Sequence, residues 1–594
     1  MGLEIYNPEG FALQIFQDRY AIHAEETFLQ ACERVARTIA DAEMGTKRDE
    51  YFARFLDILQ TNRFSPGGRI WRGAGRPRGQ LLNCFVVPAE DSREGWGDAL
   101  RNVTIISGTG GGVGINFSRV RPRGTAIRGT GGEATGSVSL MRAINAVCNE
   151  LREGGGRRGA LMFCLNWNHP DLPEFLEAKL DKNELTNANI SVLIDAEFLK
   201  LLDSDEDVVF KWQGEERGSL PAKQIWEKII ENAWENGDPG ILNMGLMQDQ
   251  NNIAYVSGGR ISATNPCGEL PLEDYGSCCL GAINLHTHVV NGEIDWDLLE
   301  ETVAMGVRFL DDVLDQNNYP LPIIQATSQK HRRIGLGVMG LHDMLLELGL
   351  KYSSPSAREI VDQVMAFIKK QAYHASISLA IEKGPFHAFD TEQYVKSGFV
   401  KKHLTRRHHR LIKEHGIRNG TILTIAPSGT ISIVAGCSSG IEPIFQPVYE
   451  RRFNKHENMH DESKKDREKQ IVVHPLLQQF LKNRRSVRHF QGAHDITPEA
   501  HILMQATCQN HVDSSISKTI NIPSDYPVEK LLSIVRKHID ELKGITVYRD
   551  GSKGESPLIP LQIDEAQKHL DEIIAQASVD DCPSGACDAE KGGS

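Results

Sequence analysis

A thiol, a carboxylate and a carboxamide occur within five residues, in the segment Asn265-Pro266-Cys267-Gly268-Glu269. Pro266 fixes its own φ and biases the preceding residue toward extended backbone, while Gly268 permits a sharp turn. The flanking residues 261–264 and 280–285 are apolar and typical of strands. The pattern therefore predicts a tight loop between buried strands that presents Cys267 for thiol chemistry. The alternative is a turn whose cysteine is buried as a small hydrophobic residue.

Other cysteines could take part in the same chemistry. Cys278 and Cys279 lie eleven and twelve positions after Cys267, and Cys84 lies within a strand-like segment, residues 81–87. The N-terminus lacks a charged-then-apolar signal pattern, so we expect a cytoplasmic protein. Its 11 cysteines should then be reduced, and any disulfide should be transient and catalytic.

Two further cysteines, Cys582 and Cys587, lie near the C-terminus. A closed zinc site would need four ligands, so we expect no structural metal here. A mobile dithiol that exchanges with a disulfide elsewhere is the favoured interpretation. The histidines at 408–409 and at 456 and 460 lie in highly charged segments, and we expect them to be solvated rather than metal-bound.

Bulk composition excludes some classes of protein. The chain has 594 residues, of which 40% are hydrophobic and 24% charged, as in ordinary soluble enzymes. A net charge of −13 argues against direct nucleic-acid binding, which favours basic proteins. There is no run of 18 apolar residues that would predict a membrane span.

The elements that must position these residues can be predicted in outline. Apolar residues at helical spacing predict a helix over residues 20–43, within an N-terminal helical domain that spans residues 1–63. Alternating strands and helices over about 480 residues predict an α/β core. Within it, a capping box at residues 356–359 predicts the start of a helix that ends near Gly384. Residues 561–594 lose this periodicity and predict a flexible tail.

Glycine-rich and hydroxyl-rich segments predict ligand contacts. Residues 108–114 and 129–132 are dense in glycine but do not match a P-loop, and residues 154–159 match G-x-G-x-x-G only as a turn. Such glycine density indicates that the backbone approaches a ligand or another chain closely. A predicted strand at residues 422–425 leads into Ala426-Pro427-Ser428-Gly429-Thr430-Ile431, which could bind phosphate. A common Pro-Ser-Gly turn is the alternative.

Taken together, these segments resemble the ribonucleotide reductases over roughly residues 20–594. The matching stretches are residues 64–69 (FSPGGR), 83–85 (NCF), 112–116 (GVGIN), 265–269 (NPCGE), 277–278 (SC), 426–431 (APSGTI), 544–551 (GITVYRDG) and the Cys-x4-Cys tail. NPCGE and GITVYRDG are similar to the class II, adenosylcobalamin-dependent branch. Class I large subunits carry two adjacent tyrosines where this chain has Val547-Tyr548, and the glycyl-radical motif of class III is not found in the sequence.

The resemblance implies a ten-stranded α/β barrel over residues 64–560, between the helical domain and the tail. It implies reduction of ribonucleotides, expected to be diphosphates, to 2′-deoxyribonucleotides by a thiyl radical that adenosylcobalamin initiates. Cys267 would carry the radical, Glu269 would be the general base, and Asn265 would position the ribose. Cys84 and Cys278 would form the redox-active disulfide. Cys582 and Cys587 would reduce that disulfide and be reduced in turn by a thioredoxin-like protein.

The resemblance also implies binding residues. The substrate residues are expected to be Ser65, Asn83, Cys84, Gly112, Asn265, Pro266, Cys267, Gly268, Glu269, Pro427, Ser428, Gly429, Thr430 and Ile431. A dNTP or ATP effector that sets base preference would contact Asp91, Ser92, Arg93, Arg121 and Arg128, with residues 181–186 linking it to the substrate. For these arginines, surface ion pairing is the alternative. A homodimer would suit such an effector site.

Two departures from the family pattern bear on the site. Cys279 stands beside Cys278 where the family commonly has asparagine, which leaves open which thiol pairs with Cys84, although the spacing from Cys267 favours Cys278. Residues 67–71 (GGRIW) replace a more usual Ser/Thr-rich stretch. The alternatives to a class II enzyme are a class I large subunit that needs a radical-generating partner and a non-catalytic nucleotide-binding homologue. The latter would be expected to lose Cys267 or Glu269.

Overall fold

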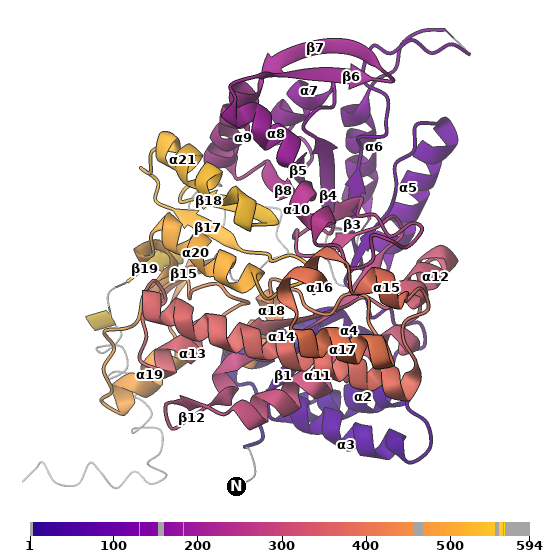
Figure 1. The fold of residues 1–594 in the computed structure, drawn as a ribbon. Helices are drawn as coiled ribbons and strands as arrows, with labels where there is room; N and C mark the ends of the chain where they lie inside the picture. The colour runs from indigo at the N-terminus through magenta and orange to yellow at the C-terminus, as the bar shows by residue number, and fades with distance from the viewer. Residues whose placement is uncertain are drawn as a thin grey trace, which may run out of the picture.

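The computed structural model describes residues 4–129, 131–151, 160–181, 183–454, 467–552, 558–561 and 563–564 (Figure 1). Most of the predicted tail, residues 561–594, therefore lies outside the described residues. The whole glycine motif at residues 154–159 lies outside them as well. No helix among the described residues is both long and apolar enough to cross a membrane.

The N-terminal region is helical, as predicted. Its helices are α1 (Gly10–Arg19), α2 (Phe28–Ala40), α3 (Lys47–Gln60) and the short α4 (Gly68–Gly73). The helix predicted over residues 20–43 starts only at Phe28, because Thr27 forms a capping box with Gln30 and ends the preceding loop. The buried face of α2 carries Cys32 and Val35, among other apolar residues at helical spacing.

A ten-stranded mixed sheet forms the centre of the molecule. Its order is β1-β11-β2-β3-β4-β5-β8-β18-β17, with β14 on the other edge of β11. The strands are β1 (Phe64–Pro66), β2 (Cys84–Val86), β3 (Gly112–Asn116), β4 (Leu161–Asn166), β5 (Ala188–Ile194), β8 (Gly240–Asn243), β11 (Ser277–Asn284), β14 (Ile334–Met339), β17 (Thr519–Ile522) and β18 (Gly544–Arg549).

Strand directions divide this sheet into parallel blocks. Strands β2, β3, β4, β5 and β8 are parallel neighbours, as are β11 with β14 and β17 with β18. The blocks meet through antiparallel pairs, β2 with β11 and β8 with β18. Most strands are buried along their whole length, which is typical of a sheet covered on both faces.

Backbone bridges link the two edges of the sheet. Leu336 in β14 bridges Leu423, and Ile425 bridges Ile516, three residues before β17. Residues 422–425, predicted as a strand, therefore make isolated bridges rather than a regular ladder. The structure confirms the predicted α/β class and the ten strands, while a continuous ladder that closes the sheet into a barrel is not observed among the described residues.

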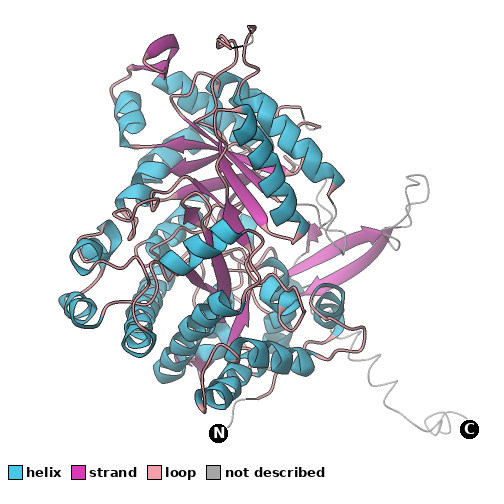
Figure 2. Cartoon of the chain, turned by 90° about the vertical axis from the view of Figure 1, so that its right-hand side faces the viewer, coloured by secondary structure: helices cyan, strands magenta, loops and turns pink. Residues whose placement is uncertain are grey.

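Helices surround these strands, which lie at the centre of the view in Figure 2. The main helices are α5 (Arg93–Gly108), α6 (Ser137–Glu150), α7 (Leu172–Glu177), α8 (Ala196–Asp203), α9 (Ala222–Asn236), α10 (Met244–Asp249), α11 (Trp296–Gln316), α12 (Pro322–His331), α13 (Leu341–Glu347), α14 (Pro355–Lys383), α15 (Thr391–Tyr394), α16 (Gly398–His403), α17 (Arg406–His415), α18 (Gly429–Ala435), α19 (Pro475–Lys482), α20 (Pro498–Gln509) and α21 (Val528–His538). Four small sheets pair β9 (Ala263–Thr264) with β10 (Pro271–Leu272), β6 (Asp207–Trp212) with β7 (Glu215–Pro221), β12 (Val289–Val290) with β13 (Glu293–Ile294), and β15 (Val448–Asn454) with β16 (Arg467–Val473) and β19 (Leu558–Pro560).

The longest of these helices, α14, begins two residues earlier than predicted. Ser354 is its N-cap and accepts a hydrogen bond from the backbone of Ala357, so the predicted capping box at residues 356–359 is wrong. Pro355 at the first helical position explains the difference, because its fixed φ suits a helix and the N–H that it lacks would have no intrahelical partner there. The predicted end near Gly384 is confirmed.

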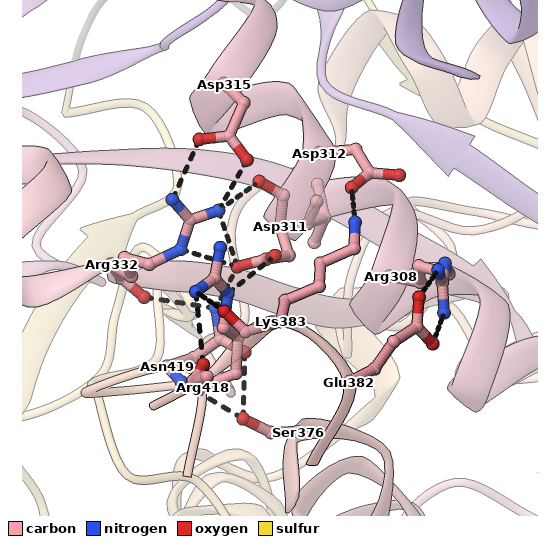
Figure 3. A network of polar contacts seen from close by, with 12 residues as sticks. Arg308, Asp311, Asp312, Asp315, Arg332, Ser376, Glu382, Lys383, Arg418 and Asn419 are labelled. Atoms are coloured by element: carbon pink, nitrogen blue, oxygen red, sulfur yellow. Dashed lines mark hydrogen bonds and ion pairs between the residues drawn. The ribbon is translucent and has the colours of Figure 1, made fainter. Parts of the chain in front are cut away.

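A buried ion network fastens α11 and α14 behind β11 and β14 (Figure 3). Arg332 donates to Asp311 at 2.9 Å and to Asp315 at 2.8 Å, and Lys383 donates to Asp312 at 2.5 Å. The arginine and lysine side chains neutralise the carboxylates of this cluster within the core. The carboxylates are therefore engaged in ion pairs and are not a free set of metal ligands.

Candidate active site

The predicted loop at residues 265–269 is confirmed as the tip of a short hairpin between β9 and β10. The Asn265 backbone N–H donates to the carbonyl of Leu270 at 3.2 Å, and the Asn265 side chain accepts from the Leu270 N–H at 3.0 Å. Gly268 has a φ of +81°, which favours glycine. This loop, residues 265–270, is called the finger loop below, and the thiol of Cys267 is exposed at it.

The glycine tract before β3 allows the finger loop to approach the sheet. A Cβ atom on Gly114 would lie 1.7 Å from the carbonyl oxygen of Thr264, and one on Gly112 would lie 2.9 Å from Cγ of Pro266. Asn189 on β5 donates to the Pro266 carbonyl at 2.9 Å. The close approach that glycine density predicted therefore serves, in part, the chain's own catalytic loop.

Cys84 and Cys278 are directly opposed on the antiparallel strands β2 and β11. Directly opposed residues in such a pair have Cα atoms about 4.5–5.5 Å apart, which lies within the range that a disulfide spans. Both cysteines are free thiols here. Their pairing as a reversible disulfide is sterically allowed without large movements of the backbone.

The structure also separates Cys278 from its neighbour. Successive side chains on a strand point to opposite faces, and the Cys279 thiol donates to the carbonyl of Leu310 on α11 at 3.3 Å, outside the sheet. Cys278 instead packs with Cys84 among the apolar residues of the inner face. Of the two thiols, Cys278 is thus the one that shares a face with Cys84.

A cavity of about 530 Å³ lies beside Cys267 and Cys84. Its volume is in the range of small-molecule sites, roughly 300–1,000 Å³. The predicted residues that line it are Asn83, Cys84, Gly112, Asn265, Pro266, Cys267, Glu269, Pro427, Ser428, Gly429, Thr430 and Ile431. Segments separated by more than 300 residues thus meet at one cavity, as a shared substrate site requires.

Three predicted residues are not part of the lining. Cys278 is fully buried behind the wall that Cys84 forms. Ser65 accepts a hydrogen bond from the Trp71 indole at 3.0 Å and holds β1 to α4. Gly268 supports the turn of the finger loop rather than the lining itself.

Several further lining residues were not predicted from the sequence. Those with charged or aromatic side chains are Asp18, Arg19, Tyr20, Arg69 and Arg72. The first three end α1 or follow it, and nothing in a helix terminus indicates a ligand. Arg69 belongs to the segment at residues 67–71 that departs from the family pattern, and Arg72 directly follows it. That departure was the one signal that could have drawn attention to them. Tyr20 joins this side of the cavity to the opposite loop, because its hydroxyl makes a short hydrogen bond with that of Thr430.

Glu269 is placed to act as a base. Burial raises the pKa of Glu269 to about 7, although hydrogen bonds from the backbone and from Asn265 act in the opposite direction. Its backbone is fixed, since its carbonyl accepts from the Thr424 hydroxyl at 2.7 Å and from the Ser515 N–H at 2.9 Å. Its Oε2 atom has no hydrogen-bond partner among the described residues. A free carboxylate oxygen at a cavity wall, with a pKa near neutrality, suits general-base catalysis.

The three thiols of the site stay protonated at neutral pH. Burial is the main cause that raises the pKa of Cys267, Cys84 and Cys278, and the nearby Glu269 raises all three further. Asn265 donates to Sγ of Cys84 at 3.0 Å, which connects the finger loop to the redox pair. Cysteine nucleophiles require a lowered pKa, so this arrangement favours thiols that donate hydrogen atoms over thiols that attack as thiolates.

The predicted phosphate loop precedes the short helix α18. Ser428 is the N-cap of α18, and its hydroxyl accepts from the Gly440 N–H at 2.8 Å. This bond holds the loop against residues 439–440. Ser428, Gly429 and Thr430 all line the cavity.

The predicted effector residues lie near α5 and the following loop. Ser92 is the N-cap of α5 and accepts from the Gly95 N–H at 2.9 Å. Arg121 forms an ion pair with Asp91 at 2.8 Å, which is the surface pairing considered as the alternative, while the side chain of Arg128 is exposed. Arg93 starts α5.

Some sequence expectations for cysteine and histidine can now be compared with the structure. Cys32, Cys148, Cys164 and Cys508 are buried, which is usual for free cysteines in a core. The prediction that the histidine pair at 408–409 is solvated is wrong for His408, which is buried and stacks on His374 at a ring distance of 4.6 Å. It lies on the inner face of α17, where its neighbours set burial despite the charged sequence. His456, His460, Cys582 and Cys587 lie outside the described residues.

Comparisons with known proteins agree with this geometry. Two family models match, "Ribonucleotide reductase, all-alpha domain" over residues 6–79 and "Ribonucleotide reductase, barrel domain" over residues 82–548. The chain is 39% identical over 575 residues to the vitamin B12-dependent ribonucleoside-diphosphate reductase of Thermoplasma acidophilum, covering 92% of this chain and 72% of the relative.

Two other relatives place this similarity in context. The protein of the same name from Mycobacterium tuberculosis (strain CDC 1551) is 35% identical over 568 residues, covering 91% of this chain and 79% of the relative. The ribonucleoside-diphosphate reductase subunit alpha of Chlamydia pneumoniae is 27% identical over 500 residues, covering 74% and 48%. With both family models and relatives of this similarity, the chain belongs to the ribonucleotide reductase family.

Proposed function

We propose that this chain reduces ribonucleotides, as diphosphates, to 2′-deoxyribonucleotides through a thiyl radical on Cys267, with adenosylcobalamin as the cofactor. The observation that carries the proposal is one cavity lined by the Cys267 thiol, the Glu269 carboxylate and Cys84, with Cys278 opposed to Cys84 on the neighbouring strand. The names of the Thermoplasma and Mycobacterium relatives support the B12 dependence and the diphosphate substrate.

The residues of the chain have distinct tasks in this reaction. As a thiyl radical, Cys267 takes the 3′-hydrogen of the ribose, while Glu269 accepts the proton of the 3′-hydroxyl. Asn265 hydrogen-bonds the sugar and positions it. Loss of the 2′-hydroxyl as water requires protons and two electrons. Cys84 and Cys278 supply them and become a disulfide.

The described residues fit the cofactor. When bound, adenosylcobalamin supplies an organic radical that can remove a hydrogen atom from a thiol. Such chemistry requires a neutral S–H group that a ligand can reach. Cys267 is accessible at the cavity, and desolvation by the protein around the cavity raises the pKa of its thiol. Ser107, Gly110–Gly112 and Ala160 line the β3 side of the cavity with small side chains and would hold the reactive end of the group there.

The substrate phosphates, in this proposal, bind to Ser428, Gly429 and Thr430. Hydroxyl and backbone N–H donors are the groups that bind phosphate at such a loop. These residues line the cavity on the β14 side of the β2–β11 pair, opposite the glycine-lined wall on the β3 side. Substrate and cofactor would therefore approach Cys267 from different directions.

Further parts of the proposal extend beyond the cavity. Asp91, Ser92, Arg93, Arg121 and Arg128 bind the specificity effector in a homodimer, and a thioredoxin-like protein re-reduces Cys582 and Cys587. The sheet closes as a ten-stranded barrel through residues 422–425, supported by their bridges to both of its edges. The proposal keeps the predicted domain division, with a helical domain at 1–63, a barrel at 64–560 and a tail at 561–594.

An anaerobic assay with and without adenosylcobalamin tests the proposal. Purified protein is mixed with a dithiol and a ribonucleoside diphosphate or triphosphate, and deoxynucleotide is measured. We expect product only when adenosylcobalamin is present, and faster with the diphosphate. Product that requires a metal-bearing partner protein instead of cobalamin would refute the cofactor assignment, and no product under either condition would refute the activity.

A further inference from the structure

The two cysteines of the redox pair differ in accessibility. Cys84 lines the cavity and is 7% exposed to solvent, whereas Cys278 is 0% exposed and is not part of the lining. Thiol–disulfide exchange requires that the attacking sulfur approach one sulfur of the disulfide from outside. Only the Cys84 side of the pair faces such an approach.

We propose that reduction of the Cys84–Cys278 disulfide has a fixed direction, in which the incoming thiolate attacks Sγ of Cys84, Cys278 leaves, and Arg333 is the positioning residue that stabilises the departing sulfur. The inference rests on the proposed function and assigns roles within its reductive half. Attack forms a mixed disulfide on Cys84 and breaks the original S–S bond, whose electron pair goes to Sγ of Cys278. That sulfur then takes a proton.

The second step returns the pair to its dithiol form. The other thiol of the reductant attacks the mixed disulfide at the reductant's own sulfur and releases Cys84, which also takes a proton. The incoming dithiol is oxidised to its disulfide and supplies both electrons and both protons. The reductant is a dithiol of the class that Cys582 and Cys587 represent.

Strand register places Arg333 beside Cys278. Cys279 is paired with Ile334 in the first pair of the parallel ladder of β11 and β14, and Cys278 and Arg333 are the residues that directly precede this pair. Paired residues of a ladder point to the same face, and Arg333 is itself only 3% exposed. The positive charge of Arg333 also lowers the pKa of Cys278, against the larger effect of burial.

A buried carboxylate holds the guanidinium in place. Glu273, at the turn between β10 and β11, lies 2.8 Å from Nη2 of Arg333 and 2.5 Å from Nδ1 of His331. Although burial opposes it, Arg333 and His331 lower the pKa of Glu273 to about 2, so the carboxylate stays ionised. Glu273 is shared between Arg333 and His331. It therefore orients the Arg333 guanidinium while its negative charge is divided between two partners.

The charge of Arg333 would offset the cost of forming a buried thiolate when Cys278 leaves. A thiolate that forms in a fully buried site is an uncompensated charge and is strongly disfavoured. The rate of exchange falls as the pKa of the leaving thiol rises. Arg333 is held by Glu273, and its positive charge favours a negative sulfur at Cys278, which no solvent reaches. The rate of the leaving step is therefore expected to depend on Arg333.

Regiochemistry can be measured without turnover. In the full chain with Cys582→Ser and Cys587→Ser, the pair is oxidised with diamide, treated briefly with 2-mercaptoethanol, quenched in acid and alkylated. Peptide mass mapping should find mercaptoethanol on Cys84 and the alkyl group on Cys278, in at least a tenfold excess over the reverse. Equal labelling or mercaptoethanol on Cys278 would overturn the direction. Deoxynucleotide formation is assayed separately, so failure of the proposed function is recognised independently.

Arg333→Gln tests the stabilising role, with Arg333→Lys as the charge-conserving control. We expect Arg333→Gln to slow reduction of the disulfide by dithiothreitol roughly tenfold, and the lysine variant to restore most of the rate. The reduction potential at neutral pH should change little, because both thiols are protonated in the product; a merely structural residue would alter potential and rate together.

Loss of Arg333 alone leaves Glu273 without its cation. If that variant does not fold, Glu273→Gln/Arg333→Gln removes both charges and should show the same slow reduction. A rate within twofold of the parent chain in the folded variants would refute the role of Arg333.

Discussion

The pKa of Glu269 predicts how the rate of ribonucleotide reduction depends on pH. A general base acts only when it is ionised, and burial raises the pKa of Glu269 to about 7. The fraction in the ionised form then increases from about one tenth at pH 6 to about nine tenths at pH 8. Because kcat/KM reports the free enzyme, it should rise about ninefold to tenfold over this range. A glutamate near its ordinary pKa would already be ionised at pH 6 and would give a nearly flat profile.

The assay is the initial rate of deoxynucleotide formation at subsaturating substrate, with a small dithiol as reductant and adenosylcobalamin in excess. Glu269→Gln should reduce the rate to background at every pH, while substrate binding measured by equilibrium dialysis is retained. A flat profile between pH 6 and pH 8 in the parent chain would refute the raised pKa. Substantial turnover by Glu269→Gln would refute the role of the carboxylate.

Lys543 is the control that this profile needs. Burial lowers the pKa of Lys543 to about 7, although Asp513 acts in the opposite direction, so Lys543 titrates over the same range. Its ammonium donates to the carbonyls of Asp513 and Ser514 at 2.7 and 2.8 Å, next to Ser515, which binds the Glu269 backbone. Lys543→Arg keeps a charge and donors there but does not titrate. The rise should persist in this variant; its disappearance would assign the profile to Lys543.

Other perturbations separate the roles of single residues. Cys267→Ser should lose turnover yet keep substrate affinity, whereas Cys279→Ser, on the outer face of β11, should keep turnover; equal loss in both would refute the assignment of the radical site. Cys582→Ser should lose turnover with a thioredoxin-like reductant but retain it with a small dithiol, and retention with both would exclude the tail as the shuttle. Gly114→Ala should displace the finger loop and lower kcat by roughly a hundredfold or prevent folding, while Gly97→Ala, whose Cβ meets nothing within 4 Å, should be silent; a silent Gly114→Ala would contradict the close approach.

The turn around Cys267 could be predicted from the sequence because residues within the turn itself determine its backbone conformation. Proline and glycine around Cys267 define a turn wherever the segment lies, and the structure has that turn. The strand period of two also separates Cys278 from Cys279 once one of them is known to face inward. Which of the two faces Cys84 depends on register with β2, and register is set by partners that are distant in the sequence.

The cavity could be predicted only in part for the same reason. Tyr20 lies beside Thr430 because α1 packs against α18, and neither segment carries a pattern that specifies the other. The predicted helix starts were wrong where a capping residue, and not hydrophobic periodicity, set the first residue of the helix, as at Thr27 and Ser354. The prediction for His408 was wrong because a charged segment does not have to be exposed on every side: one face of α17, which includes His408, is buried.

The finger loop connects catalysis to the integrity of the sheet. The carbonyl of Glu269 accepts hydrogen bonds from Thr424, in the segment that bridges β14, and from Ser515, which lies just before β17. These two segments belong to opposite edges of the ten-stranded sheet, so the loop inside the sheet is itself one of the contacts between its edges. Because the same residue supplies the proposed general base, any change that separates the edges should also move that carboxylate. Contact between the two edges of the sheet is therefore expected to be a condition of the proposed chemistry.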